Sequence, residues 1–579
     1  MIRALNRNLP FDQFTVEQIA GDLLPNATRE QKVATGFHRN TMTNTEGGTD
    51  DEEFRHEAVV DRINTSMTVW MGSTLACAQC HNHKYDPFTT KEYYQLYAFL
   101  NNTADSDKDD ERPTLKLSTP QQEQRQLELR EQISALDKKL NTQTRELDAA
   151  LARWEKSLLA APTNVPAAIS NLLAVAADQR SPKQQATLAK HYRSVAPELK
   201  PVRDELTKLR QHESELERSI PVTAVMEELA KPRETQVHLR GAYLSLGEKV
   251  EPGVPAVLHP LPTNQPLNRL AFARWLVDTN NPLTARVTMN RVWEQYFGVG
   301  LVETSQDFGT QGEAPSHPKL LDWLATEFMA RHWDLKAMHK LIVTSATYRQ
   351  SSHASPELFQ RDPYNRLLAR GPRVRLEAEL VRDQALAVSG LLSPKIGGPP
   401  VMPPQPAGIW QVVYSGDKWE TSPGEDRYRR GLYTFWRRTS PYPTMITFDA
   451  PSREYCVVKR NRSNTPLQAL TLLNDPVYVE AAQALAGRML NEAGTTPTER
   501  VAYGFRLALA REPKPAEVQR LVALYEQELA KFKADAKAAE NMVAPRTSDV
   551  PGGTDAAERA AWTVVANVLL NLDELITKG

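Results

Sequence analysis

The sequence predicts a mainly α-helical, multi-domain protein with a coiled-coil hairpin insert and a small β element. Three observations lead to this prediction. At 579 residues the chain is too long for one hydrophobic core. Apolar residues recur at three- and four-residue steps, the helical period, over most of its length. Strand-like alternation is confined to one short stretch that also contains Gly and Pro turn signals.

Residues 1–105 are predicted to form a helical domain. Within 53–71, the residues Phe54, Ala58, Ile63 and Met67 fit one face of a helix. The first residues read as the interior of a helical domain, and they lack the apolar segment and the small-residue cleavage site of a signal peptide. We therefore expect this domain to be truncated at its N-terminus.

Residues 106–218 are predicted to form a coiled-coil hairpin insert. Apolar residues follow alternating three- and four-residue steps in two runs. The first run contains Leu129, Ile133, Leu136, Leu140, Leu147, Ala150 and Trp154, and the second contains Val202, Leu206, Leu209, Leu216 and Ile220. Two helical runs of similar length joined by a structured link favour an antiparallel hairpin. Such a hairpin would serve as a spacer or as a docking arm.

Residues 219–262 are predicted to form the small β element, since 222–226 and 235–239 alternate like strands. Residues 263–579 are predicted to form a helical C-terminal domain. A loop-rich insert, at 397–460, interrupts these helices. It collects many aromatic residues: Trp410, Tyr414, Trp419, Tyr428, Tyr433, Phe435, Trp436, Tyr442 and Phe448. These rings predict either a carbohydrate-binding face or the packed interior of the insert.

Composition excludes several classes of partner. The 70 basic and 71 acidic side chains give a net charge of -1, so there is no general electrostatic attraction to nucleic acid or to an anionic membrane. No apolar run approaches 18 residues. We therefore expect no nucleic-acid partner and no membrane-spanning segment.

The segment Cys77-Ala78-Gln79-Cys80-His81 has the CxxCH pattern of a covalent haem attachment site. In c-type haem, two cysteines form thioether bonds with the porphyrin vinyl groups, and the next histidine binds the iron. The motif therefore predicts haem c, with Cys77 and Cys80 as the anchors and His81 as the proximal axial ligand of the iron.

The second axial ligand is less well defined by the sequence. The first methionine after His81 is Met226, which follows the predicted hairpin. His38, Met42 and His56 precede the motif, and His83 is too close to it in sequence to reach the opposite haem face. Of these we favour His56 as the distal ligand. A five-coordinate or water-ligated iron also stays open.

Two other interpretations of the motif stay open. Cys77 and Cys80, with one or two of His81, His83, His38 and His56, could supply four zinc ligands. The two cysteines could instead be structural or form a disulfide. The third cysteine, Cys456, has no histidine near it in sequence, and we expect a buried, inert thiol.

The loop containing Asp449, Arg453 and Glu454 supplies carboxylates that could act as acid and base on a glycan, or that could pair locally. With the aromatic insert, it suggests a haem-free glycan-binding or glycan-cleaving scaffold as an alternative function. An assembly protein that docks through its coiled coil is a third hypothesis.

Several long stretches resemble one known family. They are "NLPFDQFTVEQIAGDLLP" (8–25), the segment 50–103 around the CxxCH, the segment 281–325, and "TFDAPSREYCVVKRNRSNTPLQALTLLNDPVYVEAA" (447–482). They resemble the planctomycete cytochrome-c-associated proteins, which pair a CxxCH-bearing domain with a C-terminal domain of unknown function. The resemblance implies a periplasmic or otherwise extracytoplasmic haem protein in electron transfer or redox support. It also implies a redox partner protein and a link to polysaccharide breakdown.

Overall fold

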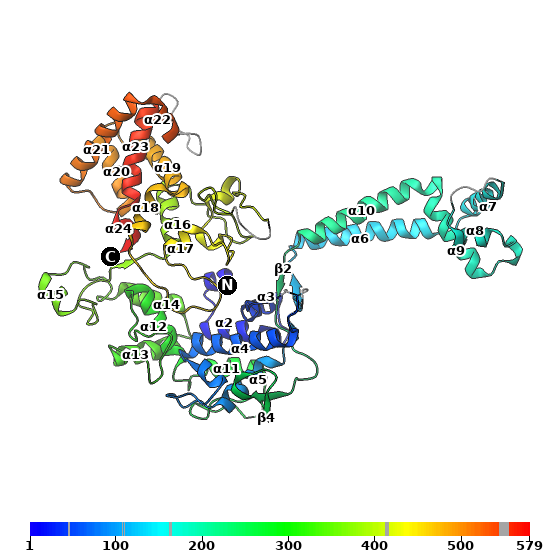
Figure 1. The fold of residues 1–579 in the computed structure, drawn as a ribbon, viewed down its shortest axis with the longest axis horizontal. Helices are drawn as coiled ribbons and strands as arrows, with labels where there is room; N and C mark the ends of the chain where they lie inside the picture. Colours follow the sequence, from blue (N-terminus) through cyan, green and yellow to red (C-terminus); the bar gives the residue numbers. More distant parts are fainter. Residues whose placement is uncertain are drawn as a thin grey trace. The chain divides into compact units, whose positions relative to one another are not determined.

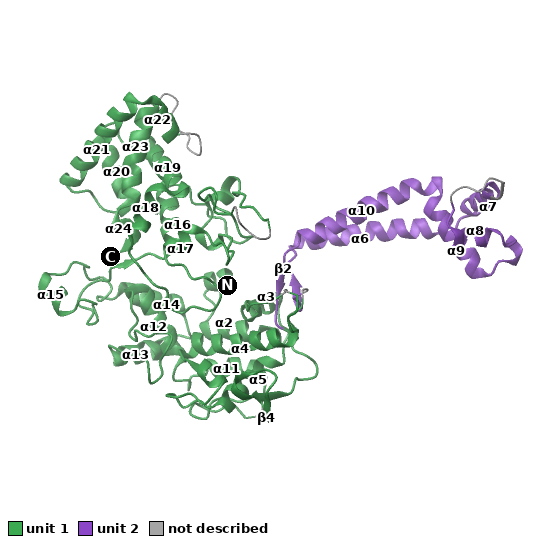
Figure 2. Cartoon of the chain, viewed as in Figure 1, with its two compact units in different colours: residues 1–109, 227–579 green, residues 110–226 purple. Residues whose placement is uncertain are grey.

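The computed structural model describes residues 1–44, 47–106, 108, 111–160, 165–263, 265–410, 416–543 and 555–579. The chain divides into two compact units, residues 1–109 with 227–579 (unit 1) and residues 110–226 (unit 2) (Figure 2). Helices dominate the described residues, and the sheets found there are two-stranded. The predicted mainly α, multi-domain class is confirmed, while the predicted four-part division stays a prediction.

The N-terminal part of unit 1 is a set of helices with 3₁₀ turns. They are α1 (Ile2–Asn6), α2 (Phe11–Ala20), η1 (Gly21–Leu23), α3 (Arg29–Ala34), η2 (Thr35–Arg39), α4 (Asp51–Met71), η3 (Leu75–Gln79) and α5 (Thr90–Asn101). Asp50 caps α4 by accepting the Glu52 N–H at 2.9 Å. The helix ends at Gly72, whose φ of 55° is left-handed. The helix predicted within 53–71 is thus confirmed.

The predicted β element is divided between the two units. In unit 1, β3 (Thr235–His238) pairs with β4 (Leu246–Val250) in an antiparallel hairpin that packs on α5. A 3₁₀ turn, η6 (Leu239–Gly241), follows β3. In unit 2, β2 (Val222–Ala224) pairs instead with β1 (Thr114–Lys116). Both predicted strands therefore form, but they do not pair with each other.

The remaining elements of unit 1 follow the hairpin (Figure 1). They are α11 (Arg269–Leu276), α12 (Thr284–Phe297), α13 (Pro318–Ala330), α14 (Leu335–Thr344), α15 (Pro356–Arg361), β5 (Val374–Arg375), α16 (Ala378–Ser389), η7 (Gly424–Tyr428), η8 (Gly431–Tyr433), α17 (Pro443–Thr447), α18 (Pro466–Asn474), α19 (Pro476–Glu492), α20 (Pro497–Leu509), α21 (Pro515–Ala534), α22 (Ala536–Met542), α23 (Ala556–Leu570), α24 (Asp573–Ile576) and β6 (Thr577–Lys578). Helix α23 packs against α19 and α21, and its Trp562 stacks on Tyr525 with ring centroids 4.2 Å apart.

Unit 2 is built on two long helices, α6 (Pro120–Asn141) and α10 (Lys200–Ser219). Ion pairs Arg130–Glu213 and Asp137–Arg210 show that the helices run antiparallel, because a later position on α6 faces an earlier one on α10. The shorter elements between them are α7 (Arg145–Ala160), α8 (Ala167–Leu173), η4 (Ala177–Gln179), α9 (Pro182–Val195) and η5 (Pro197–Leu199).

The first predicted coiled-coil run is wrong beyond Leu140. Helix α6 ends at Asn141, and Thr142 has extended backbone. Leu147, Ala150 and Trp154 lie on α7 and pack in a cluster with Tyr192 of α9. The stretch Asn141 to Thr144 is polar and adds no apolar residue to the seam. Burial of an apolar face therefore does not favour a continuous helix through it.

Candidate functional site

The CxxCH motif lies on the surface of unit 1, on the turn between α4 and α5. Leu75 and Ala78, both at most 1% exposed, anchor this turn in the core. The 3₁₀ spacing then directs Cys77 outward, and Cys80 and His81 follow at its exposed end. The three predicted haem-attachment residues are therefore accessible neighbours on one surface segment.

His81 makes a backbone contact of a kind that is common for metal-binding imidazoles. Its Nδ1 lies 2.8 Å from the carbonyl oxygen of Asn82. The carbonyl can only accept, so Nδ1 is the donor in this contact. A backbone carbonyl that holds one ring nitrogen in this way commonly orients the other toward a metal.

His83, two residues later, uses both ring nitrogens within the fold. Its Nδ1 accepts the Asp86 N–H at 2.8 Å, and its Nε2 lies 3.3 Å from the Thr74 hydroxyl. The side chain is 5% exposed. His83 therefore fixes the loop that follows the motif.

Asp86 attaches this loop to the C-terminal part of unit 1. Its carboxylate accepts the N–H of Thr310 at 2.8 Å and the Thr310 hydroxyl at 3.0 Å. A Cβ at Gly309 would lie 2.3 Å from the same carboxylate, so only glycine allows this approach. The sequence carries no pattern from which this pairing of distant segments could be predicted.

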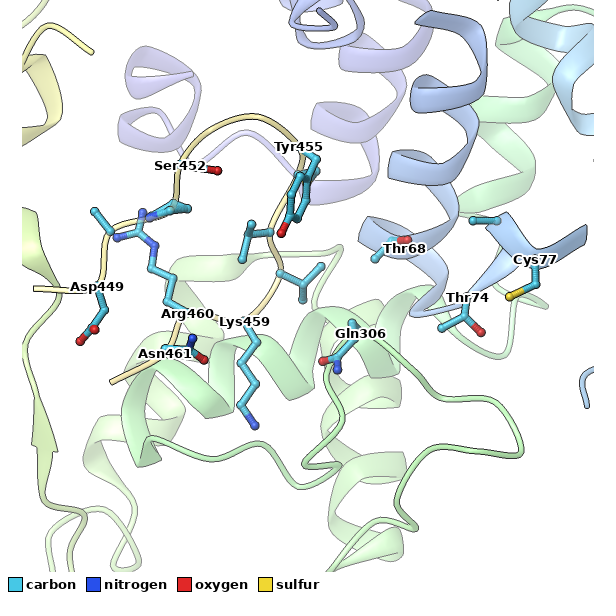
Figure 3. A pocket seen from close by; sticks show the side chains of 16 residues that line it. Thr68, Thr74, Cys77, Gln306, Asp449, Ser452, Tyr455, Lys459, Arg460 and Asn461 are labelled. Carbon is cyan, nitrogen blue, oxygen red and sulfur yellow. The ribbon is translucent and has the colours of Figure 1, made fainter. Parts of the chain in front are cut away.

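Cys77 opens into a cavity of about 750 Å³ (Figure 3). One part of the lining comes from Thr68, Thr74, Ala76, Cys77 and Gln306, and the rest comes from residues 449–452 and 455–461. Cys80 and His81 are not among the lining residues. Cavities of roughly 300–1,000 Å³ commonly hold small molecules and cofactors.

The wall opposite Cys77 is a loop closed at its base. The Asp449 carboxylate accepts the Ser463 N–H at 2.9 Å and the Ser463 hydroxyl at 2.7 Å, and it pairs with Arg375. Asp449 and Arg453 both have a φ of 65°, in the left-handed region that few non-glycine residues adopt. Asp449 is therefore a structural clamp, which disfavours it as a catalytic acid on a glycan.

Cys456 lies in this loop and lines the cavity. The prediction of a buried thiol is wrong, because the side chain is exposed. Cys456 lies on a segment without helix or strand, so its side chain is not packed into the helical core.

On its other side the motif contacts α5 and the β3–β4 hairpin. The Tyr94 hydroxyl donates to the Gln79 carbonyl at 3.1 Å. Gly241, with a φ of 76°, lies directly beside Cys80: a Cβ there would be 2.8 Å from the Cys80 Sγ. Cys77 thus borders the cavity, whereas Cys80 borders the hairpin.

A column of parallel rings begins at Tyr94. His238 stacks on Tyr94 with centroids 5.2 Å apart and on His56 with centroids 4.4 Å apart. His56 Nδ1 lies 3.0 Å from the Tyr97 hydroxyl. His56 Nε2 and His238 Nδ1 are buried and have no hydrogen-bond partner among the described residues. Burial, followed by the charges of His238 and Arg55, lowers the pKa of His56 to about 4, so its ring is neutral at pH 7.

The structure separates the other residues predicted as ligands. His56 is 1% exposed and lies behind His238, and His38 is 2% exposed in the core. All three cysteines are free thiols. In the part of the chain that is described, no three His, Cys, Asp or Glu side chains are grouped as metal ligands. The zinc interpretation therefore lacks a four-ligand site there.

The donor set of the motif fits a covalently attached haem. Both cysteines are exposed, and His81 follows Cys80 directly, with its Nδ1 held by the Asn82 carbonyl. Cys77 in addition borders a cavity of suitable volume. The prediction of His56 as the distal ligand stays a prediction.

Several predicted glycan-binding aromatics pack against one another. Trp419 contacts Trp410, Phe435 and Tyr442, with centroid distances of 5.3, 6.4 and 5.7 Å. Tyr442 is 0% and Phe448 is 1% exposed. These contacts favour the packed-interior interpretation of the insert. Tyr414 lies outside the described residues.

Two family models match the chain. "PSCyt2: Protein of unknown function (DUF1549)" matches residues 1–105, and "PSD1: Protein of unknown function (DUF1553)" matches residues 268–525. No curated protein and no solved structure matches it. Among the described helices, none is long and apolar enough to cross a membrane. The chain therefore carries two planctomycete-type domains of unknown function, with the CxxCH motif in the first and the 449–463 loop in the second.

Proposed function

We propose that this chain is an extracytoplasmic c-type haem-binding protein that acts in electron transfer or redox support. The observation that supports the proposal best is the state of His81. Its Nδ1 is held by the Asn82 carbonyl at 2.8 Å, which leaves Nε2 to bind iron, and two accessible thiols lie within four residues of it.

Cys77 and Cys80 would hold the haem through thioether bonds. Each sulfur bonds to the α-carbon of a vinyl group and the thiol hydrogen passes to the β-carbon, so that no group leaves. His81 would bind the iron through Nε2. When bound, the iron takes up and releases single electrons as it cycles between its ferrous and ferric states.

The surroundings of the motif would keep this ligand set in place. His83 and Asp86 fix the segment that follows His81, through hydrogen bonds to Thr74 and Thr310. A rigid support of this kind would keep the His81 imidazole in one orientation for a bound haem.

The location and partners follow from this chemistry and from the resemblance. Bacterial c-type haem attachment takes place outside the cytoplasm, so the proposed location is periplasmic or otherwise extracytoplasmic. Single-electron transfer requires a redox partner protein. A link to polysaccharide breakdown rests on the resemblance alone.

The test is a pyridine haemochrome spectrum of the full chain, exported together with the haem c maturation machinery. We expect a c-type α band that survives denaturation and acid–acetone extraction. The band should be lost in Cys77→Ala/Cys80→Ala and kept in Cys456→Ala, the matched control for the third exposed thiol. A folded but colourless wild-type protein would refute the proposal.

A further inference from the structure

The cavity beside Cys77 is built from both family domains. Cys77 belongs to the domain matched over 1–105, and the loop that forms the opposite wall belongs to the domain matched over 268–525. Figure 3 shows Cys77 on one side of the cavity and Lys459 and Asn461 on the other. The cavity therefore has a sulfur of the motif at one end and a basic and an amide side chain at the other.

The two walls are held in place by contacts outside the cavity. At the end of α4, the Thr68 carbonyl accepts the Arg291 guanidinium at 2.6 Å, and the Gly72 carbonyl accepts the Phe308 N–H at 2.7 Å. These bonds join α4, and with it the motif turn, to α12 and to the segment that precedes α13. Asp449 clamps the opposite loop at its base. The cavity is thus part of the fold, as cofactor sites commonly are.

The lining also includes apolar side chains from both walls. They are Ala76, Ala450, Pro451, Val457 and Val458. A haem is likewise apolar over its ring, and it carries its vinyl groups and its two propionates at different edges. A haem attached at Cys77 would therefore meet apolar side chains over its ring and the polar residues of the loop at its propionate edge.

Lys459 is the lining cation that can pair with a propionate. Its Nζ donates to the Glu303 carbonyl oxygen at 3.2 Å, and it forms no ion pair with a carboxylate among the described residues. Arg460, the other cation of the lining, already pairs with Glu377 and Glu379 at 3.3 and 2.7 Å. A carboxylate that is partly removed from water is stabilised by a charge-assisted hydrogen bond from an ammonium group.

We propose that the cavity between the CxxCH turn and the 449–463 loop holds the haem attached at Cys77 and Cys80, with Lys459 paired to a propionate. The inference rests on the proposed function and makes the haem site common to the two family domains. Cys80 and His81 lie beyond the lining, at the exposed end of the turn. The attachment edge of the haem is therefore at the mouth of the cavity, and the ring extends from it toward the loop.

The first test is amide hydrogen exchange of the full chain with and without haem, with haem content measured by haemochrome. The haem-free sample is the chain expressed without the maturation machinery. We expect exchange in 450–462 to slow by roughly tenfold when haem is attached, because the loop then covers a bound group. Helix α21, which contributes no residue to the lining, is the internal control and should be unchanged.

The second test is the reduction potential of loaded variants. Lys459→Gln and Lys459→Glu should lower the potential in two successive steps, because each removes positive charge beside the haem and so favours ferric iron. Lys336→Gln is the matched control. Lys336 is also an exposed lysine whose Nζ donates to a backbone carbonyl, that of Asn6 at 2.7 Å, and it does not line the cavity.

The outcomes separate this inference from the proposed function. A wild type without haem refutes the proposed function. A loaded chain in which 450–462 exchanges as fast as in the haem-free chain refutes the placement in the cavity and leaves haem attachment intact. Slowed exchange, with the same potential in both Lys459 variants as in the wild type, overturns the assignment of Lys459. An equal shift in Lys336→Gln also overturns that assignment, since it would reflect net charge alone.

Discussion

His56 and His238 stack face to face, with ring centroids 4.4 Å apart and planes inclined by 9°. His56 comes from α4 and His238 from β3, so the stack joins two elements that lie on either side of unit 2 in the sequence. Both rings are kept neutral, since burial is the main cause that lowers the pKa of each. Two neutral rings can stack without charge repulsion, and the pair packs as an aromatic contact.

Replacing His56 tests this packing. His56→Ala removes a buried ring and leaves a cavity beside His238, so we expect unfolding to become easier by roughly 2–4 kcal/mol. His56→Phe keeps a stacking ring and should cost under about 1.5 kcal/mol. Urea unfolding followed by circular dichroism measures both. Equal losses in the two variants would show that the imidazole, and not the stacked ring, is needed.

Helix α4 also contributes to a buried ion pair, between Arg62 and Asp105. Asp105 accepts two hydrogen bonds from Arg62, at 2.5 and 3.2 Å, and the side chains are 7% and 1% exposed. Burial acts to raise the pKa of Asp105, but Arg62 lowers it well below its usual value. Asp105→Asn leaves a buried guanidinium without its counter-charge.

We therefore expect Asp105→Asn to destabilise the fold by roughly 3–5 kcal/mol. Glu217→Gln, which breaks the exposed pair with Lys116, should cost less than about 1 kcal/mol. Chemical denaturation at pH 7 distinguishes them. A similar small loss in both variants would show that the buried pair contributes no more than a surface one.

Much of the fold could be predicted from helical periodicity, and the errors have physical reasons. The helix at 53–71 was predicted because burial on one face imposes the 3.6-residue period. The break after Asn141 was missed because Leu147 continues the heptad spacing even though the chain turns there. Strand partners were also missed: Val222–Ala224 pairs with Thr114–Lys116, and alternation shows that a strand exists but not which strand lies beside it.

Only part of the candidate site could be predicted from the sequence. Cys77, Cys80 and His81 are adjacent in sequence, so their spacing alone predicts their chemistry. The opposite wall of the cavity comes from residues near Cys456, which are far away in the chain. His238 likewise carries no motif. Only the fold brings it to the CxxCH segment, through Tyr94 and the glycine that follows β3.

His38 should make the stability depend on pH. Burial, with smaller contributions from Arg62 and Arg269, lowers its pKa to about 3. The folded state therefore favours the neutral ring. Its contribution is complete above the unfolded pKa of about 6.5 and is lost as the pH falls toward 3. Each pH unit in this window lowers the free energy of unfolding by about 1.4 kcal/mol.

Comparing wild type with His38→Gln by urea unfolding between pH 7 and pH 4.5 isolates this contribution. The wild type should lose roughly 2–3 kcal/mol more than the variant over this range. Parallel pH profiles for the two proteins would mean that His38 does not titrate between its folded and unfolded states.

The Asp449 clamp should hold the 449–463 loop against the cavity. Asp449→Ala removes charge-assisted hydrogen bonds to Ser463 and Arg375, each worth about 1.5–3 kcal/mol. We expect amide hydrogen exchange in 450–462 to become roughly 10- to 100-fold faster. Asp449→Gly removes the left-handed strain as well as the clamp, and Glu454→Gln is the control in the same loop. Unchanged exchange in both Asp449 variants would show that the loop is held by other contacts.

Unit 2 should be removable without unfolding unit 1. The hydrophobic clusters of unit 1 contain no residue from 110–226 among their described members, and those of unit 2 lie within 140–199. At the base of the hairpin, the Leu117 N–H donates to the Pro221 carbonyl at 2.8 Å, so the chain leaves and returns at neighbouring points. An Asn-Gly turn in place of 118–220 would join the two strands by a two-residue hairpin.

We expect the shortened chain to unfold cooperatively and, under the conditions that load the full chain, to bind as much haem. Aggregation or loss of cooperative unfolding would show that unit 1 depends on the hairpin. Loss of haem alone, with folding intact, would instead connect the hairpin to haem attachment.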